Sequence, residues 1–212
     1  NYGGFTQPVW YWLCGFTQGA HGFSETMNAP QWPAEAMVEM WQSRMAAVPW
    51  VIALQQYNLL GSHDTPRIRT LVGGNDALHR LATALLLTFP GVPGLYYGDE
   101  IGMTDVPDLG ARGCMIWDES RQDRALYDYH KRLIHFRRSS TALQRGGFQM
   151  LLIEPDTIAY QRESIDERVI VVAHRSETPR PPGPLPLSHT GVADGTQFID
   201  LMSGTEFIAR EG

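Results

Sequence analysis

The chain has 212 residues, of which 43% are hydrophobic and 19% are charged, and its formal net charge is −6. This length suffices for a buried core in one or two domains. The negative balance argues against a surface that binds nucleic acid or another polyanion, and two cysteines with no Cys or His array at metal-ligand spacing indicate neither a disulfide framework nor a metal site.

The first 50 residues predict an aromatic segment followed by a helix. Residues 1–22 are rich in glycine and carry Trp10, Tyr11 and Trp12 in a row; packing in a core is favoured over a sugar-stacking surface. Between Pro33 and Pro49 an apolar stripe at helical spacing predicts an amphipathic helix; the stripe comprises Met37, Met40, Trp41, Met45 and Val48.

The next segment has the pattern of strand, helix and strand. Residues 56–60 are typical of a buried strand that ends in the polar loop 61–64, and Asn75 is a suitable N-cap for a helix that ends before Pro90. Residues 92–97 predict a second strand, which ends in the charged loop 98–100. This order favours a right-handed parallel βαβ unit. Prolines and glycines interrupt the apolar stretch 82–97, so it is not a membrane-spanning helix.

The last third changes from helical to strand periodicity. Ser120 and Asp123 indicate the start of a helix, on which the basic residues 131–138 are read as a solvated face. Residues 148–154, 157–163 and 168–174 predict an antiparallel meander. A proline-rich loop at 179–186 follows, and residues 197–201 and 205–208 are expected to close the sheet. The boundary near Gly146 separates an α/β part, 1–146, from an all-β part, 147–212.

Both predicted parallel strands end in acidic residues, Asp64 after the first and Asp99 with Glu100 after the second. In parallel α/β folds catalytic groups lie at these C-terminal ends. From the residues alone two interpretations remain open. Either the carboxylates take part in a reaction, or Asp64 caps the turn that follows it and Glu100 pairs with an arginine.

Three segments resemble the α-amylase family of glycoside hydrolases. Residues 58–67, NLLGSHDTPR, resemble the motif after the seventh barrel strand, and residues 91–103, GVPGLYYGDEIGM, resemble the eighth strand. Residues 112–119, RGCMIWDE, are similar to the segment before the last barrel helix. The resemblance is strongest with the branch that contains neopullulanase, cyclomaltodextrinase, maltogenic amylase and maltodextrin glucosidase. It implies the C-terminal portion of a (β/α)8 TIM barrel, strands 7 and 8 with flanking helices, followed by an antiparallel β-sandwich domain.

The resemblance also implies roles for four residues. Asp64 matches the third catalytic carboxylate, which is neither nucleophile nor proton donor but holds sugar hydroxyls and supports an oxocarbenium-like transition state. His63 matches a histidine that donates to the same glucose unit. Asp108 and Arg112 match a pair that binds the next glucose, although the loop between them departs from the usual Asp-Pro-Asp-Cys. The alternative for that pair is a surface ion pair of little energetic weight.

The nucleophile and the acid/base of the family follow the fourth and fifth strands. Because Asn1-Tyr2 resembles the end of the sixth strand, both are expected upstream of this chain. A whole barrel takes about 250 residues, and the acids examined as replacements lie on predicted loops or helices: Glu25, Glu35, Glu39 and Asp76. We therefore expect a fragment that is inactive alone and exposes apolar strand edges.

The function implied by the resemblance is hydrolysis, with retention, of α-1,4 and also α-1,6 glucosidic bonds in maltodextrins, cyclodextrins or pullulan. The alternatives are glucan transfer by the same groups, or a non-catalytic amylase-like module, against which the intact His63-Asp64 pair argues. The expected partner is an α-glucan oligosaccharide or polysaccharide, with no cofactor, metal, nucleic acid or membrane. Members of this branch often dimerise through an N-terminal domain outside this chain, so the resemblance allows a homodimer and leaves the oligomeric state open.

Overall fold

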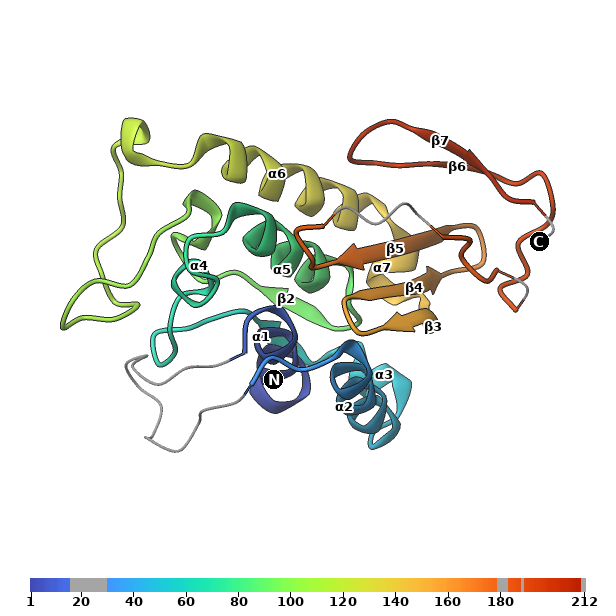
Figure 1. Cartoon of the computed structure of the whole chain (residues 1–212), viewed down its shortest axis with the longest axis horizontal. Helices are drawn as coiled ribbons and strands as arrows, with labels where there is room; N and C mark the ends of the chain where they lie inside the picture. Colours follow the sequence, from blue (N-terminus) through green and yellow to red (C-terminus); the bar gives the residue numbers. More distant parts are fainter. Residues whose placement is uncertain (16–29, 179–182, 188, 211–212) are drawn as a thin grey trace.

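The computed structural model describes residues 1–15, 30–178, 183–187 and 189–210 (Figure 1). Glu25 and the first half of the predicted proline-rich loop lie outside these ranges. Among the described helices none is long and apolar enough to cross a membrane.

A parallel βαβ unit lies at the centre of the α/β part. Strands β1 (Tyr57–Leu59) and β2 (Val92–Gly94) pair in parallel, and the short α4 (Ile68–Leu71) and the longer α5 (Asp76–Thr88) connect them. The Asn75 side chain accepts from the Leu78 amide at 3.1 Å and so caps α5 as predicted. Strand β2 is shorter than expected because Tyr96 and Tyr97 turn toward residues 111–113, where their hydroxyls donate to carbonyls.

The N-terminal segment packs against β1. A π-helix, η1 (Tyr2–Thr6), continues into α1 (Gln7–Leu13), and α2 (Ala34–Ala46) and α3 (Trp50–Ala53) follow. The Thr6 hydroxyl donates to Leu59 O at 2.7 Å, and Trp10 Nε1 donates to Leu60 O at 2.9 Å. All three aromatic residues at positions 10–12 are buried, as expected for core packing. The segment thus fixes β1 just before the loop that carries Asp64.

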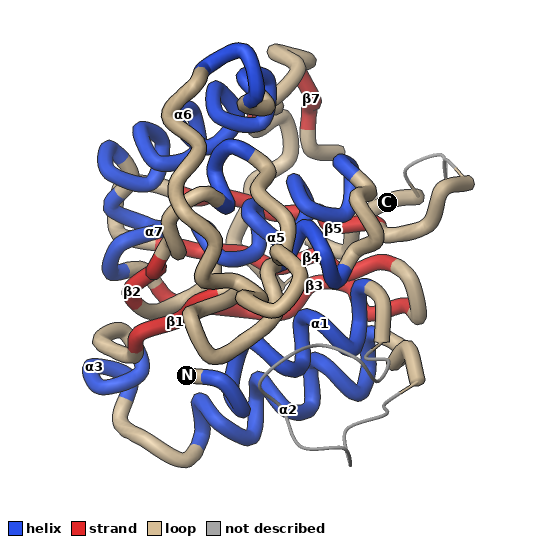
Figure 2. The backbone as a smooth tube through the Cα atoms, turned by 90° about the vertical axis from the view of Figure 1, so that its left-hand side faces the viewer, coloured by secondary structure: helices blue, strands red, loops and turns tan. Residues whose placement is uncertain are grey.

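After β2 the chain forms η2 (Asp99–Ile101), an extended loop, η3 (Glu119–Arg121) and two helices, α6 (Arg124–Ser139) and α7 (Thr141–Arg145). Asp123 caps α6 by accepting from the Leu126 amide. Figure 2 shows α5, α6 and α7 on one side of the strands and α1 and α2 on the other. One residue of the basic stretch on α6 departs from the prediction, because Arg137 is buried rather than solvated.

The predicted meander is present as β3 (Gly147–Glu154), β4 (Thr157–Glu163) and β5 (Arg168–His174), all antiparallel. Ile158, Tyr160 and Ala173 of this sheet belong to the same hydrophobic cluster as Trp10 and Leu85 of the α/β part. The sheet therefore packs directly on the helices.

The expectation that the last two strands close this sheet is wrong for the described residues. Strands β6 (Gln197–Ile199) and β7 (Glu206–Ile208) pair only with each other, and Figure 1 shows their hairpin apart from β3–β5. The hairpin is closed locally by Asp200, whose carboxylate accepts from the Met202 amide and the Ser203 hydroxyl. Local closure does not depend on an edge of the larger sheet, and the described strands do not form a two-sheet sandwich.

Candidate active site

The loop after β1 presents His63 and Asp64 to solvent through a tight local turn. The Ser62 amide donates to Thr65 Oγ1 at 2.7 Å, and the Asp64 amide donates to Ser62 Oγ at 3.1 Å. The Tyr2 hydroxyl lies 2.7 Å from the same Ser62 oxygen and joins η1 to the turn. These contacts fix the backbone, so the Asp64 side chain, 60% exposed, projects from a rigid support.

Asp64, Arg112 and His63 meet at this loop. Arg112 Nη2 donates to Asp64 Oδ1 at 3.0 Å, and Arg112 Nε donates to the backbone oxygen of His63, also at 3.0 Å. His63 Nε2 lies 3.2 Å from Asp64 Oδ2. One carboxylate is thus flanked by the Arg112 guanidinium and the His63 imidazole, and all three side chains are open to solvent. The group offers both acceptors and donors to a ligand rich in hydroxyls.

Asp108 lies in the exposed turn between Val106 and Gly110, which pair with each other across it. Its backbone has a left-handed φ of 63°, which aspartate tolerates better than most residues. Within the described residues no ion pair joins Asp108 to Arg112, because the guanidinium is engaged by Asp64 instead. Three of the four residues singled out from the sequence are therefore in contact, and Asp108 stands by itself.

The acid at the end of β2 has a different environment. Asp99 is buried, and its Oδ1 accepts from Arg67 Nη1 at 3.1 Å in an ion pair whose side chains are 5% and 0% exposed. Burial raises the pKa of Asp99 to about 7, although the Arg67 guanidinium acts in the opposite direction. For Glu100, pairing with an arginine was one of two open interpretations; in the structure its carboxylate accepts from the Gly98 amide at 2.8 Å.

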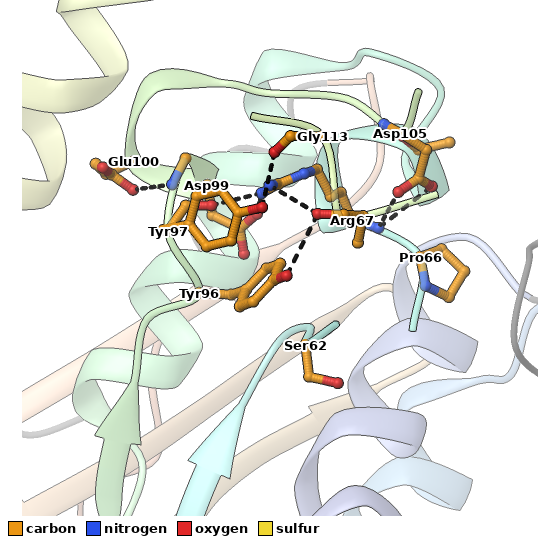
Figure 3. A network of polar contacts seen from close by, with 12 residues as sticks. Ser62, Pro66, Arg67, Tyr96, Tyr97, Asp99, Glu100, Asp105 and Gly113 are labelled. Atoms are coloured by element: carbon orange, nitrogen blue, oxygen red, sulfur yellow. Dashed lines mark hydrogen bonds and ion pairs between the residues drawn. The ribbon is translucent and has the colours of Figure 1, made fainter. Parts of the chain in front are cut away.

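Arg67 was not singled out from the sequence, although it closes the 58–67 motif. Its guanidinium also donates to Tyr97 O at 2.7 Å and to Ala111 O at 3.0 Å, and it lies 4.9 Å from the ring centroids of Tyr96 and Tyr97 (Figure 3). Its backbone amide donates to the Asp105 carboxylate. No periodicity predicts such a residue, because a fully buried arginine is identified only by its partners.

The acids considered as substitutes for a nucleophile do not join this group. Glu35 and Glu39 are exposed on α2, and Asp76 pairs with Arg69 near the start of α5. Among the described residues no set of three or more His, Cys, Asp or Glu side chains is placed to hold a metal ion.

Comparison with known proteins identifies the family. The sequence model of the family "Alpha amylase, catalytic domain" matches residues 16–119. A cyclomaltodextrinase from Geobacillus thermopakistaniensis is 38% identical over 156 residues, which are 73% of this chain and 26% of that protein. Neopullulanase 2 from Thermoactinomyces vulgaris is 35% identical over 177 residues, 82% of this chain and 29% of that protein.

Solved structures agree with the sequence matches. A cyclic α-maltosyl-(1→6)-maltose hydrolase from Arthrobacter globiformis aligns with a TM-score of 0.65 at 37% identity, over 69% of this chain and 33% of that one. Ttha1563 from Thermus thermophilus aligns over 97% of this chain and 43% of its own, with a TM-score of 0.81 at 28% identity.

This chain belongs to the α-amylase family of glycoside hydrolases, as its motifs predicted. The matched relatives carry the names cyclomaltodextrinase, neopullulanase and maltogenic amylase, which are those of the predicted branch. The chain spans between 21% and 30% of the length of the first five curated relatives.

Proposed function

We propose that this chain supplies the sugar-binding and transition-state-stabilising part of a retaining glycosidase. The substrates are α-1,4, and also α-1,6, glucosidic bonds of maltodextrins, cyclodextrins or pullulan. The observation that carries the proposal is the exposed Asp64 carboxylate at the end of a parallel strand, held between Arg112 and His63. The relatives named cyclomaltodextrinase, neopullulanase and cyclic α-maltosyl-(1→6)-maltose hydrolase support this substrate class.

In this proposal Asp64 accepts hydrogen bonds from hydroxyls of the glucose at the reacting carbon. Such bonds strengthen as the ring distorts toward the oxocarbenium-like transition state, and they contribute several kcal/mol in glycosidases. His63 donates to the same sugar, and Arg112 with Asp108 binds the next glucose toward the non-reducing end. Sugar hydroxyls would then compete with Arg112 for the oxygens of Asp64, and with Asp64 for the donors of Arg112.

Retention requires a nucleophile and an acid/base about 5–5.5 Å apart. We propose that both come from sequence upstream of Asn1, and that residues 1–146 are the end of the catalytic barrel while residues 147–212 form a C-terminal domain. Exposed apolar side chains on the β1–β2 pair, Tyr57 and Val92, support a further barrel portion that covers them. The chain alone would be inactive.

The test is an assay of the protein with its native upstream sequence on maltotriose, β-cyclodextrin and pullulan. The expected result is release of short maltooligosaccharides whose reducing ends first appear as the α-anomer by proton NMR. First appearance of the β-anomer would contradict retention, and products longer than the substrate would favour glucan transfer. Absence of any reaction on all three would support a non-catalytic module.

A further inference from the structure

The backbone on both sides of Arg112 is held by side chains from other segments. Ala111 O accepts from Arg67 Nη2 at 3.0 Å and from the Tyr96 hydroxyl at 3.3 Å. Gly113 O accepts from the Tyr97 hydroxyl at 2.7 Å. Both carbonyls that flank Arg112 are therefore fixed by tyrosines that follow β2, and Ala111 O is also held by Arg67 from the segment that carries Asp64.

The Arg112 side chain does not hold itself in place. It is 61% exposed and its partner Asp64 is 60% exposed, and solvent-exposed ion pairs of this kind contribute only about 0–1 kcal/mol. A pair so weak cannot fix the loop that carries it. The bond from Arg112 Nε to His63 O is also exposed to solvent. The backbone that carries Arg112 must therefore be held by other contacts, and these are the bonds to Ala111 O and Gly113 O.

Arg67 is suited to this role because it is rigid. It is fully buried, its guanidinium is paired with Asp99, and it lies against the rings of Tyr96 and Tyr97. A planar guanidinium with fixed donors loses little further freedom when it binds a carbonyl. It also lies three residues after Asp64, so movement of Arg67 would shift both members of the Asp64–Arg112 pair.

We infer that Arg67 and Tyr97 are positioning residues that hold the carbonyls on either side of Arg112 and thereby fix its guanidinium against Asp64. This inference rests on the proposed function, in which Arg112 and Asp64 bind neighbouring glucose units. Sites of this kind require placement of their groups to within about 0.5 Å. Neither residue need touch the sugar.

The test compares Tyr97→Phe with Tyr129→Phe in the protein with its native upstream sequence. Tyr129 is a matched control, because its hydroxyl also donates to a backbone carbonyl, Arg80 O at 3.2 Å, but between α5 and α6. Tyr97→Phe is expected to raise KM for maltotriose about three- to tenfold with kcat nearly unchanged, as for loss of binding shared by ground and transition states. Tyr129→Phe should leave both constants unchanged.

A double-mutant cycle separates positioning from general destabilisation. If Tyr97 acts through Arg112, Tyr97→Phe should have no further effect on KM in an Arg112→Ala background. Equal effects in both backgrounds would overturn the inference. Arg67→Lys, which keeps the charge but not the planar fork, should reproduce the KM increase and lose it in the same background.

Hydrogen exchange provides a readout independent of activity. Tyr97→Phe should accelerate amide exchange in residues 105–117 selectively, whereas Tyr129→Phe should not. If the wild-type protein hydrolyses no glucan, the proposed function fails, and the exchange rates still decide whether Tyr97 holds this loop. If residues 105–117 exchange at the wild-type rate in Tyr97→Phe, the inference is overturned.

Discussion

The two strand-end carboxylates differ in burial, and this difference assigns them different physical roles. Asp99 is buried with Arg67, and removing one partner of a buried ion pair leaves the other charge without compensation. Asp64 is open to solvent, where its ion pair with Arg112 contributes little to stability. The exposed carboxylate is available to a ligand and the buried one is not.

Unfolding measurements on two matched variants check this assignment. Asp99→Ala is expected to lower the free energy of unfolding by about 3–5 kcal/mol, because Arg67 stays buried without its carboxylate. Asp64→Ala should change it by less than about 1 kcal/mol. Urea denaturation of both variants and the wild type measures the difference, and equal losses in the two variants would refute the assignment.

Three exposed residues that the sequence motifs single out lie together in the structure, whereas the buried pair Arg67–Asp99 has no such sequence signal. Asp64, His63 and Arg112 were predicted from the family motifs, and the three are in contact. Which arginine pairs with which acid was not predictable, because the partners Arg67 and Asp99 lie 32 positions apart and meet only through the loop after β2. The sugar-binding and catalytic roles of all four predicted residues, Asp108 included, remain proposals.

At the scale of elements, helices α5 and α6 bury two histidines against each other. The rings of His79 and His130 lie 6.0 Å apart at 86°. Burial lowers the pKa of His79 to about 3, with a further lowering from His130, and burial also lowers the pKa of His130. The folded protein therefore keeps both rings neutral below the pH at which an exposed histidine is protonated.

The pH dependence of stability follows from that difference. Well above pH 6.5 His79 is neutral in both the folded and the unfolded state and contributes no slope. As the pH falls from 6.5 toward 3, His79 becomes protonated in the unfolded chain but stays neutral in the folded protein. The free energy of unfolding therefore decreases, by up to about 1.4 kcal/mol per pH unit. His79→Leu should remove about 2 kcal/mol of the loss between pH 6.5 and 5, measured by urea denaturation at each pH.

The exposed His135 on the same helix, α6, is the control for this prediction. His135→Leu should leave the slope as in the wild type. The same acid sensitivity in His79→Leu as in the wild type would show that His79 is protonated in the folded state.

The carbonyl groups at the C-terminal end of α5 accept hydrogen bonds from arginines of other elements. Arg137 of α6 donates to Leu87 O at 2.8 Å, and Arg162 of β4 donates to Thr88 O at 2.7 Å and to Gly146 O at 3.1 Å. Positive charge is favourable at a helix C-terminus, where carbonyls lack intrahelical partners. Arg162 thus joins the sheet to the βαβ unit.

Loss of this contact should be costly. Arg162→Met is expected to lower the free energy of unfolding by on the order of 3 kcal/mol, because it leaves buried carbonyls without donors. Arg138→Met, at an exposed position on α6, should change it by less than about 0.5 kcal/mol. Thermal unfolding of the two variants side by side gives the comparison, and a neutral Arg162→Met would contradict the role given to the contact.

Element prediction succeeded where periodicity was long and failed where contacts are local. The meander strands and the capped helix α5 lie where the pattern placed them. The π-helix η1 and the four-residue α3 had no signal, because a single turn has no apolar repeat. The solvated position predicted for Arg137 is wrong. A charged residue on a mainly polar helix face is normally solvated, whereas this guanidinium donates to three backbone carbonyls.

At the scale of the whole molecule, one hydrophobic cluster crosses the proposed domain boundary. Tyr160 of β4 is fully buried, its hydroxyl lies 2.6 Å from Thr88 Oγ1, and its ring contacts Trp41 of α2. Deleting residues 147–212 would expose this surface to water. The piece 1–146 is therefore expected to aggregate or to unfold without a cooperative transition, as measured by calorimetry and size-exclusion chromatography. A soluble piece with a sharp transition would show that the two parts are independent in stability.

The most direct test of the account is the rate of glucan hydrolysis by Asp64→Asn in the protein with its native upstream sequence. Asp166→Asn, at an exposed position between β4 and β5, serves as the matched control. If Asp64 stabilises the transition state, kcat/KM for maltotriose should fall by on the order of a hundredfold or more while the unfolding temperature stays unchanged. Wild-type kcat/KM in Asp64→Asn would contradict the role of Asp64 on which this account depends.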